Sequence, residues 1–225
     1  MQNSHRILDS VSCPQDIHCL NNDELDILAS EIREEIISTT SKTGGHVAAS
    51  LGAVELILAV HSLIDCPRDK FVFDVGHQSY AHKIITGRRD EFKNLRQYKK
   101  LSGFPKPVES LCDVHYSGHA SDSLSVALGL ARARKQRGSN EKVVVLIGDA
   151  SIAGGMAFEA LNQIGQEKLP IVIILNDNNM AISPTIGGMM THLSNARLSS
   201  RYKDARDVVY NSLQAMGSAG EMAIR

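Results

Sequence analysis

The chain has 225 residues, of which 43 % are hydrophobic and 22 % charged, and its formal net charge is −1. This is the balance of one globular α/β domain, without the basic surface by which proteins bind nucleic acids. The absence of Trp and an aromatic content of 4 % also argue against a surface that stacks on bases.

The four cysteines, at positions 13, 19, 66 and 112, form no C-x-x-C pattern. Their spacing favours neither a zinc site nor a disulfide framework, so we expect reduced thiols and a cytoplasmic protein. The first 20 residues contain no apolar core of signal-peptide length, and no apolar run approaches the roughly 20 residues that span a bilayer. We therefore expect no membrane association.

The first elements are an arm and a helix. Residues 1–21 are polar and irregular, and we expect an N-terminal arm there. Residues 21–40 predict a helix that Asn22 or Asp23 caps. Its apolar residues recur at helical spacing, at Leu25, Leu28, Ile32 and Ile36.

Two helices and a strand are predicted next. Residues 47–64 follow two glycines and are mostly apolar, which predicts a buried helix. Residues 70–74 form a short strand pattern, and residues 79–87 predict a helix that ends at Gly87. The polar residues 88–110 have no clear period.

The clearest pattern lies between residues 121 and 177. A helix is predicted over 121–138, and a strand over 142–149 is followed by a helix over 154–168 and a strand over 170–177. Both strands are continuously apolar, as in a parallel sheet that helices cover on both faces. The sequence therefore predicts an α/β domain with a doubly wound, mostly parallel sheet.

Polar clusters follow both of these strands, at Gly148–Ser151 and at Asn176–Met180. Asp149 and Asn178 are one strand–helix–strand unit apart, so the chain returns beside its starting point. Their side-chain oxygens suit Mg²⁺, and the small residues after Asp149 leave room for a diphosphate bound to that metal. Taken singly, each cluster also fits an ordinary turn or polar loop. The chain lacks the G-x-G-x-x-G and P-loop patterns.

Five stretches resemble 1-deoxy-D-xylulose-5-phosphate synthases, which belong to the transketolase superfamily of thiamine-diphosphate enzymes. The resemblance runs from about residue 25 to about residue 202, and the most specific stretch is DVGHQSYAHKIITGRRDEF. The others are TGGHVAASLGAVEL, SGHASDSLSVALGLA, GDASIAGGMAFEALN and ILNDNNMAIS. The resemblance implies the thiamine-diphosphate-binding fold and the condensation of pyruvate with D-glyceraldehyde 3-phosphate, with release of CO₂, in isoprenoid precursor synthesis.

The resemblance also implies a metal and diphosphate site. Asp149, the Asn178 side chain and the main-chain carbonyl of Met180 would bind Mg²⁺, and Asn178 would also face the cofactor. Ala150 and Ser151 would contact the diphosphate. Ala150 stands where the family has glycine, which matters if this position needs a positive φ.

Three histidines complete the expected site. His77, Gly118, His119 and Ala120 would line the cofactor, and Ala120 stands where the family commonly has serine. His46 would face the reacting carbon as an acid–base or orienting group, since the unperturbed pKa of histidine, roughly 6.5, lies near neutral pH.

Other histidines have structural interpretations. His61 lies within an apolar helix and is expected in the core, whereas structural and functional roles are evenly balanced for His82. His115 and His119 are four residues apart but lack a third ligand, which argues against zinc. The basic residues 87–100 are expected to be a solvated surface.

The family's members are much longer than this chain. We expect residues 22–225 to be a diphosphate-binding domain that is incomplete at its C-terminus, without the pyrimidine-binding and C-terminal domains. The pyrimidine domain carries a glutamate that activates the cofactor, so we expect the chain alone to be inactive. Three readings stay open: part of a homodimeric synthase, one subunit of a split enzyme with a partner chain, and a non-catalytic binding module. An unrelated nucleotide-binding protein is a more distant alternative.

Overall fold

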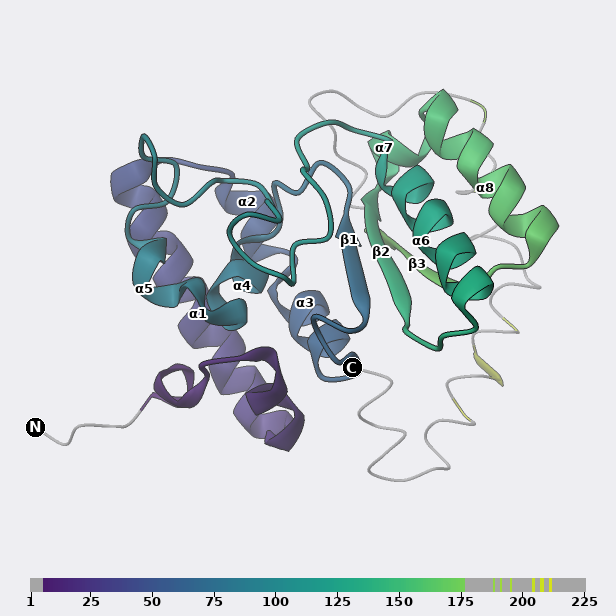
Figure 1. Ribbon diagram of the computed structural model, residues 1–225. Helices are drawn as coiled ribbons and strands as arrows, with labels where there is room; N and C mark the ends of the chain where they lie inside the picture. Colours follow the sequence, from purple (N-terminus) through teal and green to yellow (C-terminus); the bar gives the residue numbers. More distant parts are fainter. Residues whose placement is uncertain are drawn as a thin grey trace, which may run out of the picture. The chain divides into compact units, whose positions relative to one another are not determined.

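The structure is a computed structural model that describes residues 6–176 and seven isolated positions after them. The chain divides into two compact units, Met1–Asp177 and Asn178–Arg225. The first unit carries all the helices and strands described below (Figure 1).

Three parallel strands form the sheet within the described residues. Their order is β1–β2–β3, with bounds Lys70–Phe73, Val143–Gly148 and Ile171–Asn176. The helices and helical turns are η1 (Ile7–Ser10), η2 (Pro14–Cys19), α1 (Asn22–Thr43), α2 (Val47–Leu51), α3 (Val54–His61), α4 (Tyr80–Lys83), η3 (Ile84–Arg88), α5 (Arg89–Phe92), α6 (Ser123–Arg137), α7 (Asp149–Ile152) and α8 (Gly155–Glu167). All three predicted strands are confirmed.

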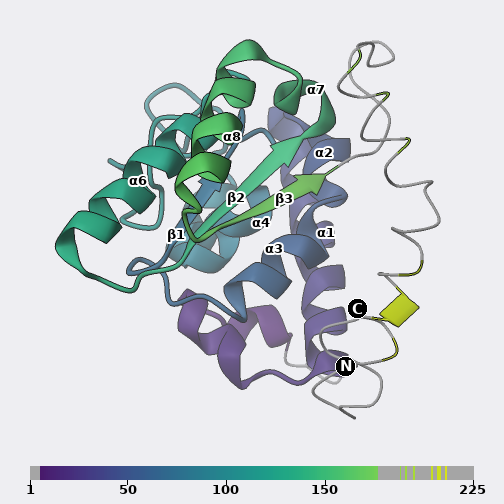
Figure 2. The same ribbon diagram turned by 90° about the vertical axis from the view of Figure 1, so that its right-hand side faces the viewer.

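Helices cover both faces of this sheet. Val144 and Leu146 of β2 belong to one apolar cluster with Phe71, Phe73 and the buried sides of α1 and α3. The alternate residues of β2 point to the opposite face, as the period of a strand requires, and α6 packs there with α8 beside it. Figures 1 and 2 show α6 and α8 on one side of the sheet and α1 and α3 on the other. The predicted α/β fold with helices on both faces is confirmed.

Helix α1 begins with a reciprocal cap. The Asn21 side chain accepts a hydrogen bond from the Glu24 N–H at 3.0 Å, and the Glu24 carboxylate accepts one from the Asn21 N–H at 2.8 Å. The prediction of Asn22 or Asp23 as the cap was wrong, because only Asn21 has a glutamate three residues later. The apolar stripe Leu28, Ile32 and Ile36 is fully buried, as the helical spacing predicted.

The N-terminal segment corrects the expectation of an irregular arm over residues 1–21. In its described part the chain folds into the 3₁₀ helices η1 and η2. Leu8 and Ile17 are fully buried in the main apolar cluster, and the Leu8 N–H donates to the Glu31 carboxylate at 2.7 Å. A few apolar side chains thus suffice to fix a largely polar segment on α1. A domain boundary at residue 22 stays a prediction.

The apolar stretch 47–64 forms two helices rather than the single helix expected. Gly52 and Ala53 separate α2 from α3, and the dihedral angles of Ala53 are not helical. The predicted helix end at Gly87 is confirmed by its φ of +84°, which interrupts the helical backbone within η3 and which favours glycine.

A buried cluster of charged groups fixes the loop that precedes α6. The Asp113 carboxylate accepts hydrogen bonds from the two terminal guanidinium nitrogens of Arg88, at 2.6 and 2.9 Å, and from the Lys106 N–H at 2.6 Å. The His82 Nε2 lies 3.0 Å from the same carboxylate. Burial raises the pKa of Asp113, but the hydrogen bonds from His82 and Arg88 outweigh burial and hold that pKa well below its usual range.

The histidines of this cluster are structural. His61 is fully buried, which confirms its expected place in the core, and His82 is buried too. Burial lowers the pKa of both rings, so both are neutral at pH 7. If His82 Nε2–H donates to Asp113, then His82 Nδ1 accepts from His61 Nε2–H across the 2.9 Å between these atoms.

Two further observations concern the described residues alone. Cys13, Cys19, Cys66 and Cys112 are all free thiols. None of the described helices combines the length and the apolar character that crossing a membrane would take.

We expect Asp113→Asn to lower the free energy of unfolding at pH 7 by about 3–5 kcal/mol, because it leaves the Arg88 charge buried without its carboxylate. Urea unfolding measures this change. Since the pKa of Asp113 is depressed in the folded state, its contribution is present above an unfolded pKa of about 3.9 and is lost as the pH falls further.

The control is Glu55→Gln, which breaks the exposed ion pair with Arg33 and should cost no more than about 1 kcal/mol. An Asp113→Asn variant that is no less stable than this control at pH 7 would contradict the network.

Candidate functional site

The carboxyl ends of the three strands meet at one edge of the sheet. Gly148, the last residue of β2, pairs with Asn176, the last residue of β3. In Figure 2 the arrowheads of both strands point to this edge, near α7. The register therefore aligns the last residues of β2 and β3 at this edge. Asn178 and Met180 lie outside the described residues, so their roles stay predictions.

Asp149 lies directly after β2. It is the first residue of α7 and is 4 % exposed, whereas Ala150 is exposed. Ala150 and Ser151 have helical backbone, and Ala150 has no positive φ. The methyl group of Ala150 therefore causes no backbone strain, although the family that the sequence resembles has glycine at this position.

The loop before α6 approaches the same edge. Gly118 has a φ of +142°, and a Cβ added to it would meet no described atom within 4 Å. His119 and Ala120 are exposed. The backbone N–H of Ser121 donates to Asp74, which follows β1, and the Ser121 hydroxyl donates to the Ser151 carbonyl at 2.7 Å. Ser121 thus connects the segment after β1 with the segment after β2.

His77 and His46 face each other beside β1. Their ring centroids are 5.6 Å apart in an edge-on arrangement. The Ser50 hydroxyl of α2 donates to the His77 carbonyl at 2.9 Å, and the His46 N–H donates to the Tyr80 hydroxyl at 3.1 Å. The His77 Nδ1 atom is buried and has no hydrogen-bond partner among the described residues, so it is available to a ligand.

A positive charge adjoins His46. The Arg96 Nη1 atom is 3.4 Å from His46 Nδ1, and the Phe104 ring is 5.8 Å from the His46 ring between centroids. Burial and then Arg96 lower the pKa of His46, and burial and then His46 lower the pKa of His77. Both rings are therefore neutral at pH 7, and each can accept a proton at one nitrogen.

Residues 8–225 match a family model described as 1-deoxy-D-xylulose-5-phosphate synthase. The chain belongs to this family. The synthase of Lachnoclostridium phytofermentans is 48 % identical over 219 residues, which cover 97 % of this chain and 35 % of that protein. The synthase of Syntrophus aciditrophicus is 49 % identical over 222 residues, or 99 % of this chain and 34 % of the relative. Synthase 1 of Geobacter sulfurreducens is 47 % identical over 215 residues, covering 96 % and 34 %.

The chain thus spans about a third of the length of the curated synthases that it matches. It corresponds to their N-terminal domain, and the family consists of transferases of the transketolase type.

The residues of the synthase family's expected cofactor site fit a diphosphate and a hard metal ion. Added Cβ atoms at Gly118, Gly148 and Gly155 would meet no described atom within 4 Å, so there is open space beside the backbone at these glycines. Asp149 supplies a hard oxygen. The described residues hold no group of three or more His, Cys, Asp or Glu side chains that suits a metal. The expected ligand set differs from such groups, because its other members are an amide and a main-chain carbonyl.

Sequence reasoning missed two residues of this region. Arg96 was assigned to a solvated surface, and its contact with His46 spans 50 positions, which no local pattern reveals. Asp74 was not singled out, although a signal exists. Like Asp149, it directly follows an apolar strand.

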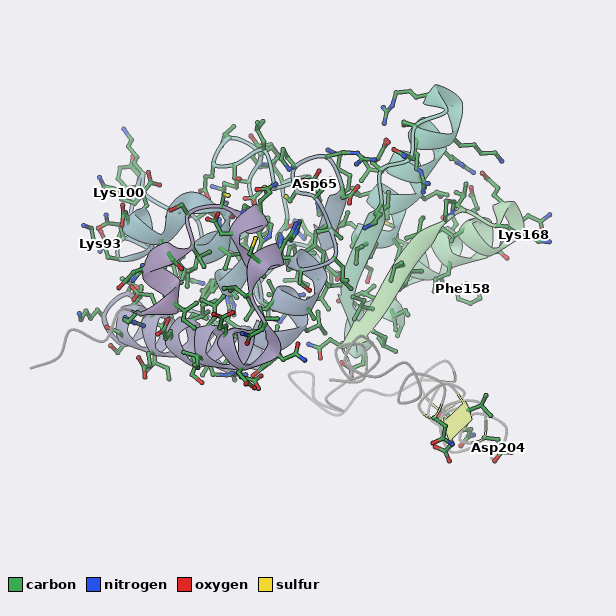
Figure 3. The ribbon with its side chains drawn as sticks, turned by 90° about the horizontal axis from the view of Figure 1, so that it is seen from below. Asp65, Lys93, Lys100, Phe158, Lys168 and Asp204 are labelled. Carbon is green, nitrogen blue, oxygen red and sulfur yellow. The ribbon has the colours of Figure 1, made fainter. Side chains whose placement is uncertain are left out.

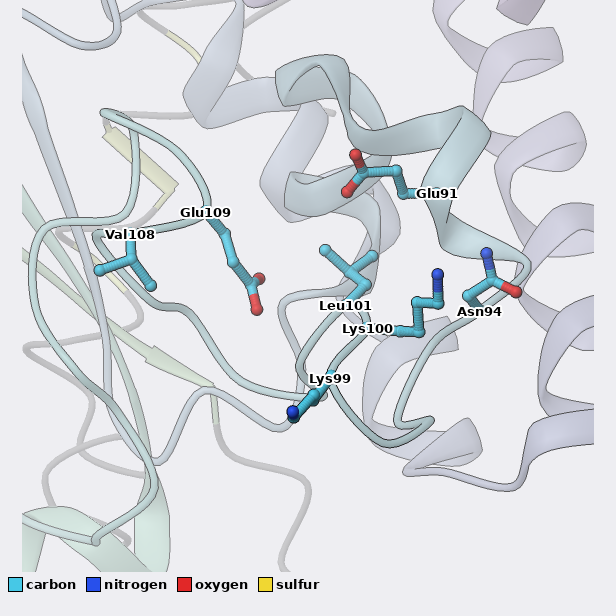
Figure 4. A pocket seen from close by; sticks show the side chains of 7 residues that line it. All are labelled: Glu91, Asn94, Lys99, Lys100, Leu101, Val108 and Glu109. Atoms are coloured by element: carbon cyan, nitrogen blue, oxygen red, sulfur yellow. The ribbon is translucent and has the colours of Figure 1, made fainter.

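A hollow of about 450 Å³ lies elsewhere, near α5 (Figure 4). Lys99, Lys100, Glu91 and Glu109 are among its lining residues, and none of the expected cofactor residues is. Figure 3 shows Lys93 and Lys100 at the opposite side of the unit from Phe158 of α8 and from Lys168, which follows α8. Glu109 already accepts hydrogen bonds from Lys83 at 2.6 Å and from the Ser102 N–H at 2.8 Å. The role of this carboxylate is therefore structural.

We expect Arg96→Gln to raise the pKa of His46 toward 6.5, because it removes the adjacent positive charge. Histidine ring signals in an NMR pH titration measure the change. Lys100→Gln removes a charge from the same loop and should leave the His46 signal unchanged. Equal His46 pKa values in Arg96→Gln and the parent would show that Arg96 does not act on this ring.

Proposed function

We propose that this chain binds thiamine diphosphate together with Mg²⁺, as the diphosphate-binding part of a 1-deoxy-D-xylulose-5-phosphate synthase. The complete enzyme would condense pyruvate with D-glyceraldehyde 3-phosphate and release CO₂. The main support is the meeting of three loops, 74–77, 118–121 and 148–151, at the carboxyl edge of the sheet, in a chain of this family. Ligands of open α/β sheets bind at that edge.

The metal would bind to Asp149, with the Asn178 side chain and the Met180 carbonyl as further ligands. Asp149 and the main chain at Ala150 and Ser151 start a short helix directly after β2. This arrangement supports a site where a carboxylate holds Mg²⁺ and backbone N–H groups face the diphosphate.

The loop at Gly118, His119 and Ala120 and the ring of His77 would line the rest of the cofactor. The open space at Gly118 and the buried, unpartnered Nδ1 of His77 support this assignment. Because Ala120 has no hydroxyl, it would contact the cofactor only through its main chain and its methyl group.

When bound, thiamine diphosphate supplies the electron sink for the carbanion equivalent that pyruvate leaves on losing CO₂. His46 would orient the substrate or move a proton, and its neutral ring can do both. The Arg96 guanidinium beside it would attract an anionic substrate such as pyruvate and stabilise its carboxylate. The 3.4 Å between Arg96 Nη1 and His46 Nδ1 supports the assignment of both side chains to one substrate.

We further propose that the groups for the pyrimidine end of the cofactor, including the activating glutamate, come from sequence outside these 225 residues. They would belong to the same protein, as a homodimer, or to a partner chain of a split enzyme. The relatives are nearly three times as long as the matched region, which supports both arrangements. We expect no turnover from the chain alone, and cytoplasmic location stays a prediction.

Asp149→Ala should weaken the Mg²⁺-dependent affinity for thiamine diphosphate by about 100-fold or more. Loss of residues that only orient metal ligands already costs roughly 10–100-fold. Titration calorimetry of the full chain with the cofactor, in Mg²⁺ and in excess EDTA, measures this loss.

The control variant is Asp90→Ala, because Asp90 is an exposed carboxylate on α5, and it should bind as the parent does. If the parent chain binds no cofactor, the proposed function fails for the isolated chain. If Asp149→Ala binds as tightly as Asp90→Ala, the metal assignment is wrong.

A further inference from the structure

Asp74 is a buried carboxylate to which the expected site does not assign a role. It lies directly after β1 and is 1 % exposed. Its two oxygens accept the Ser121 N–H at 3.0 and 3.1 Å, the Ser123 N–H at 3.3 Å and the Ser123 hydroxyl at 2.6 Å. A charged acceptor of several hydrogen bonds makes each of them stronger than a neutral acceptor would.

The loop that Asp74 holds has a strained backbone. Ser121 has a φ of +76°, a region where residues other than glycine lose roughly 1–3 kcal/mol. Such a conformation persists only where surrounding contacts impose it. The bonds from Asp74 to both sides of this turn, at Ser121 and Ser123, supply that constraint.

Ser121 also contacts the segment that follows β2. Its hydroxyl donates to the Ser151 carbonyl at 2.7 Å. A Cβ at Gly154 would lie only 2.1 Å from the Ser121 hydroxyl oxygen, so the absence of a side chain there is what lets Ser121 reach α7. The Asp74 carboxylate, directly after β1, thereby holds the loop before α6, and Ser121 of that loop connects it with the segment after β2.

We propose that Asp74 is the positioning residue of the cofactor site. It fixes residues 118–120 through Ser121 and Ser123, and residues 149–151 through the Ser121–Ser151 hydrogen bond, without touching the cofactor. The proposal rests on the proposed function, because Asp74 would hold these two loops in the positions in which they bind the diphosphate and its metal.

The chain offers a matched control at the opposite edge of the sheet. Asp69 is also buried, at 4 % exposure. Its carboxylate accepts the Asp65 N–H at 3.0 Å and the Lys142 N–H at 2.8 Å. It therefore ties together the segments that enter β1 and β2, whereas Asp74 ties the segment that leaves β1 to the loop before α6. Asp69→Asn and Asp74→Asn each turn an acceptor oxygen into an amide group facing N–H donors.

The experiment measures three quantities for the 225-residue parent chain, Asp74→Asn and Asp69→Asn. These are the calorimetric affinity for thiamine diphosphate with Mg²⁺, the urea midpoint of unfolding, and amide hydrogen exchange without cofactor. We expect both variants to have similarly lowered midpoints. Only Asp74→Asn should bind the cofactor at least about tenfold more weakly, the effect expected for a residue that orients ligands, with faster exchange at residues 118–123 and 149–151.

A cofactor affinity of Asp74→Asn equal to that of Asp69→Asn would overturn the proposal. If Asp74→Asn does not fold, Ser121→Ala takes its place, since it removes only the hydroxyl that reaches Ser151. Faster exchange at 149–151 and weaker binding in this variant support the proposal, and parental values for both overturn it.

Failure of the proposed function has a different signature. In that case the parent itself binds no cofactor, and hydrogen exchange alone decides whether Asp74 holds the two loops. Exchange at 149–151 that rises in Asp74→Asn and not in Asp69→Asn supports the positioning role. Equal exchange in the two variants overturns it.

Discussion

Parallel pairing of β1, β2 and β3 is the constraint on which the rest of the structure depends. Parallel strands need helical crossovers between them, so every strand delivers its carboxyl end to the same edge. The paired positions Gly148 and Asn176 align the last residues of β2 and β3, and the N–H of Asp74, directly after β1, donates to the Leu146 carbonyl of β2 at 2.8 Å. Segments that are far apart in sequence thereby form one polar edge above an apolar sheet.

The two ends of this sheet are built alike but serve different purposes. At each one a buried aspartate, Asp69 or Asp74, collects backbone N–H groups that would otherwise lack partners. At the amino end, the Asp69 carboxylate accepts hydrogen bonds from the N–H groups of Asp65 and Lys142. Within the part of the chain that the structure describes, the carboxyl end leaves open space at glycines and a buried nitrogen of His77 without a hydrogen-bond partner. Unsatisfied polar groups beside open backbone suit a ligand better than they suit a core.

Sequence predicted the elements whose signals are local. The continuous apolar strands, the helix ends at glycine and the aspartate after β2 are readable within a few residues, and the structure contains them. The 3₁₀ helices at the N-terminus were missed because Leu8 and Ile17 show no period, and the break at Gly52 because the apolar run continues across it. Contacts between distant positions, such as Asp113 with Arg88 and Arg96 with His46, leave no local trace. For the site, the sequence placed Asp149 directly after the second predicted apolar strand, as the structure has it, whereas the binding roles of the site residues stay predictions. The roles of Asn178 and Met180 stay predictions because both lie outside the described residues.

Site-resolved binding tests the central claim most directly. The amide signals of the isotope-labelled 24.5 kDa chain would be recorded by NMR while thiamine diphosphate and Mg²⁺ are added. We predict that the largest shifts cluster at residues 76–78, 118–121 and 148–155, at the carboxyl edge of the sheet. Shifts centred on the hollow near α5, or no shifts at saturating cofactor, would contradict this claim.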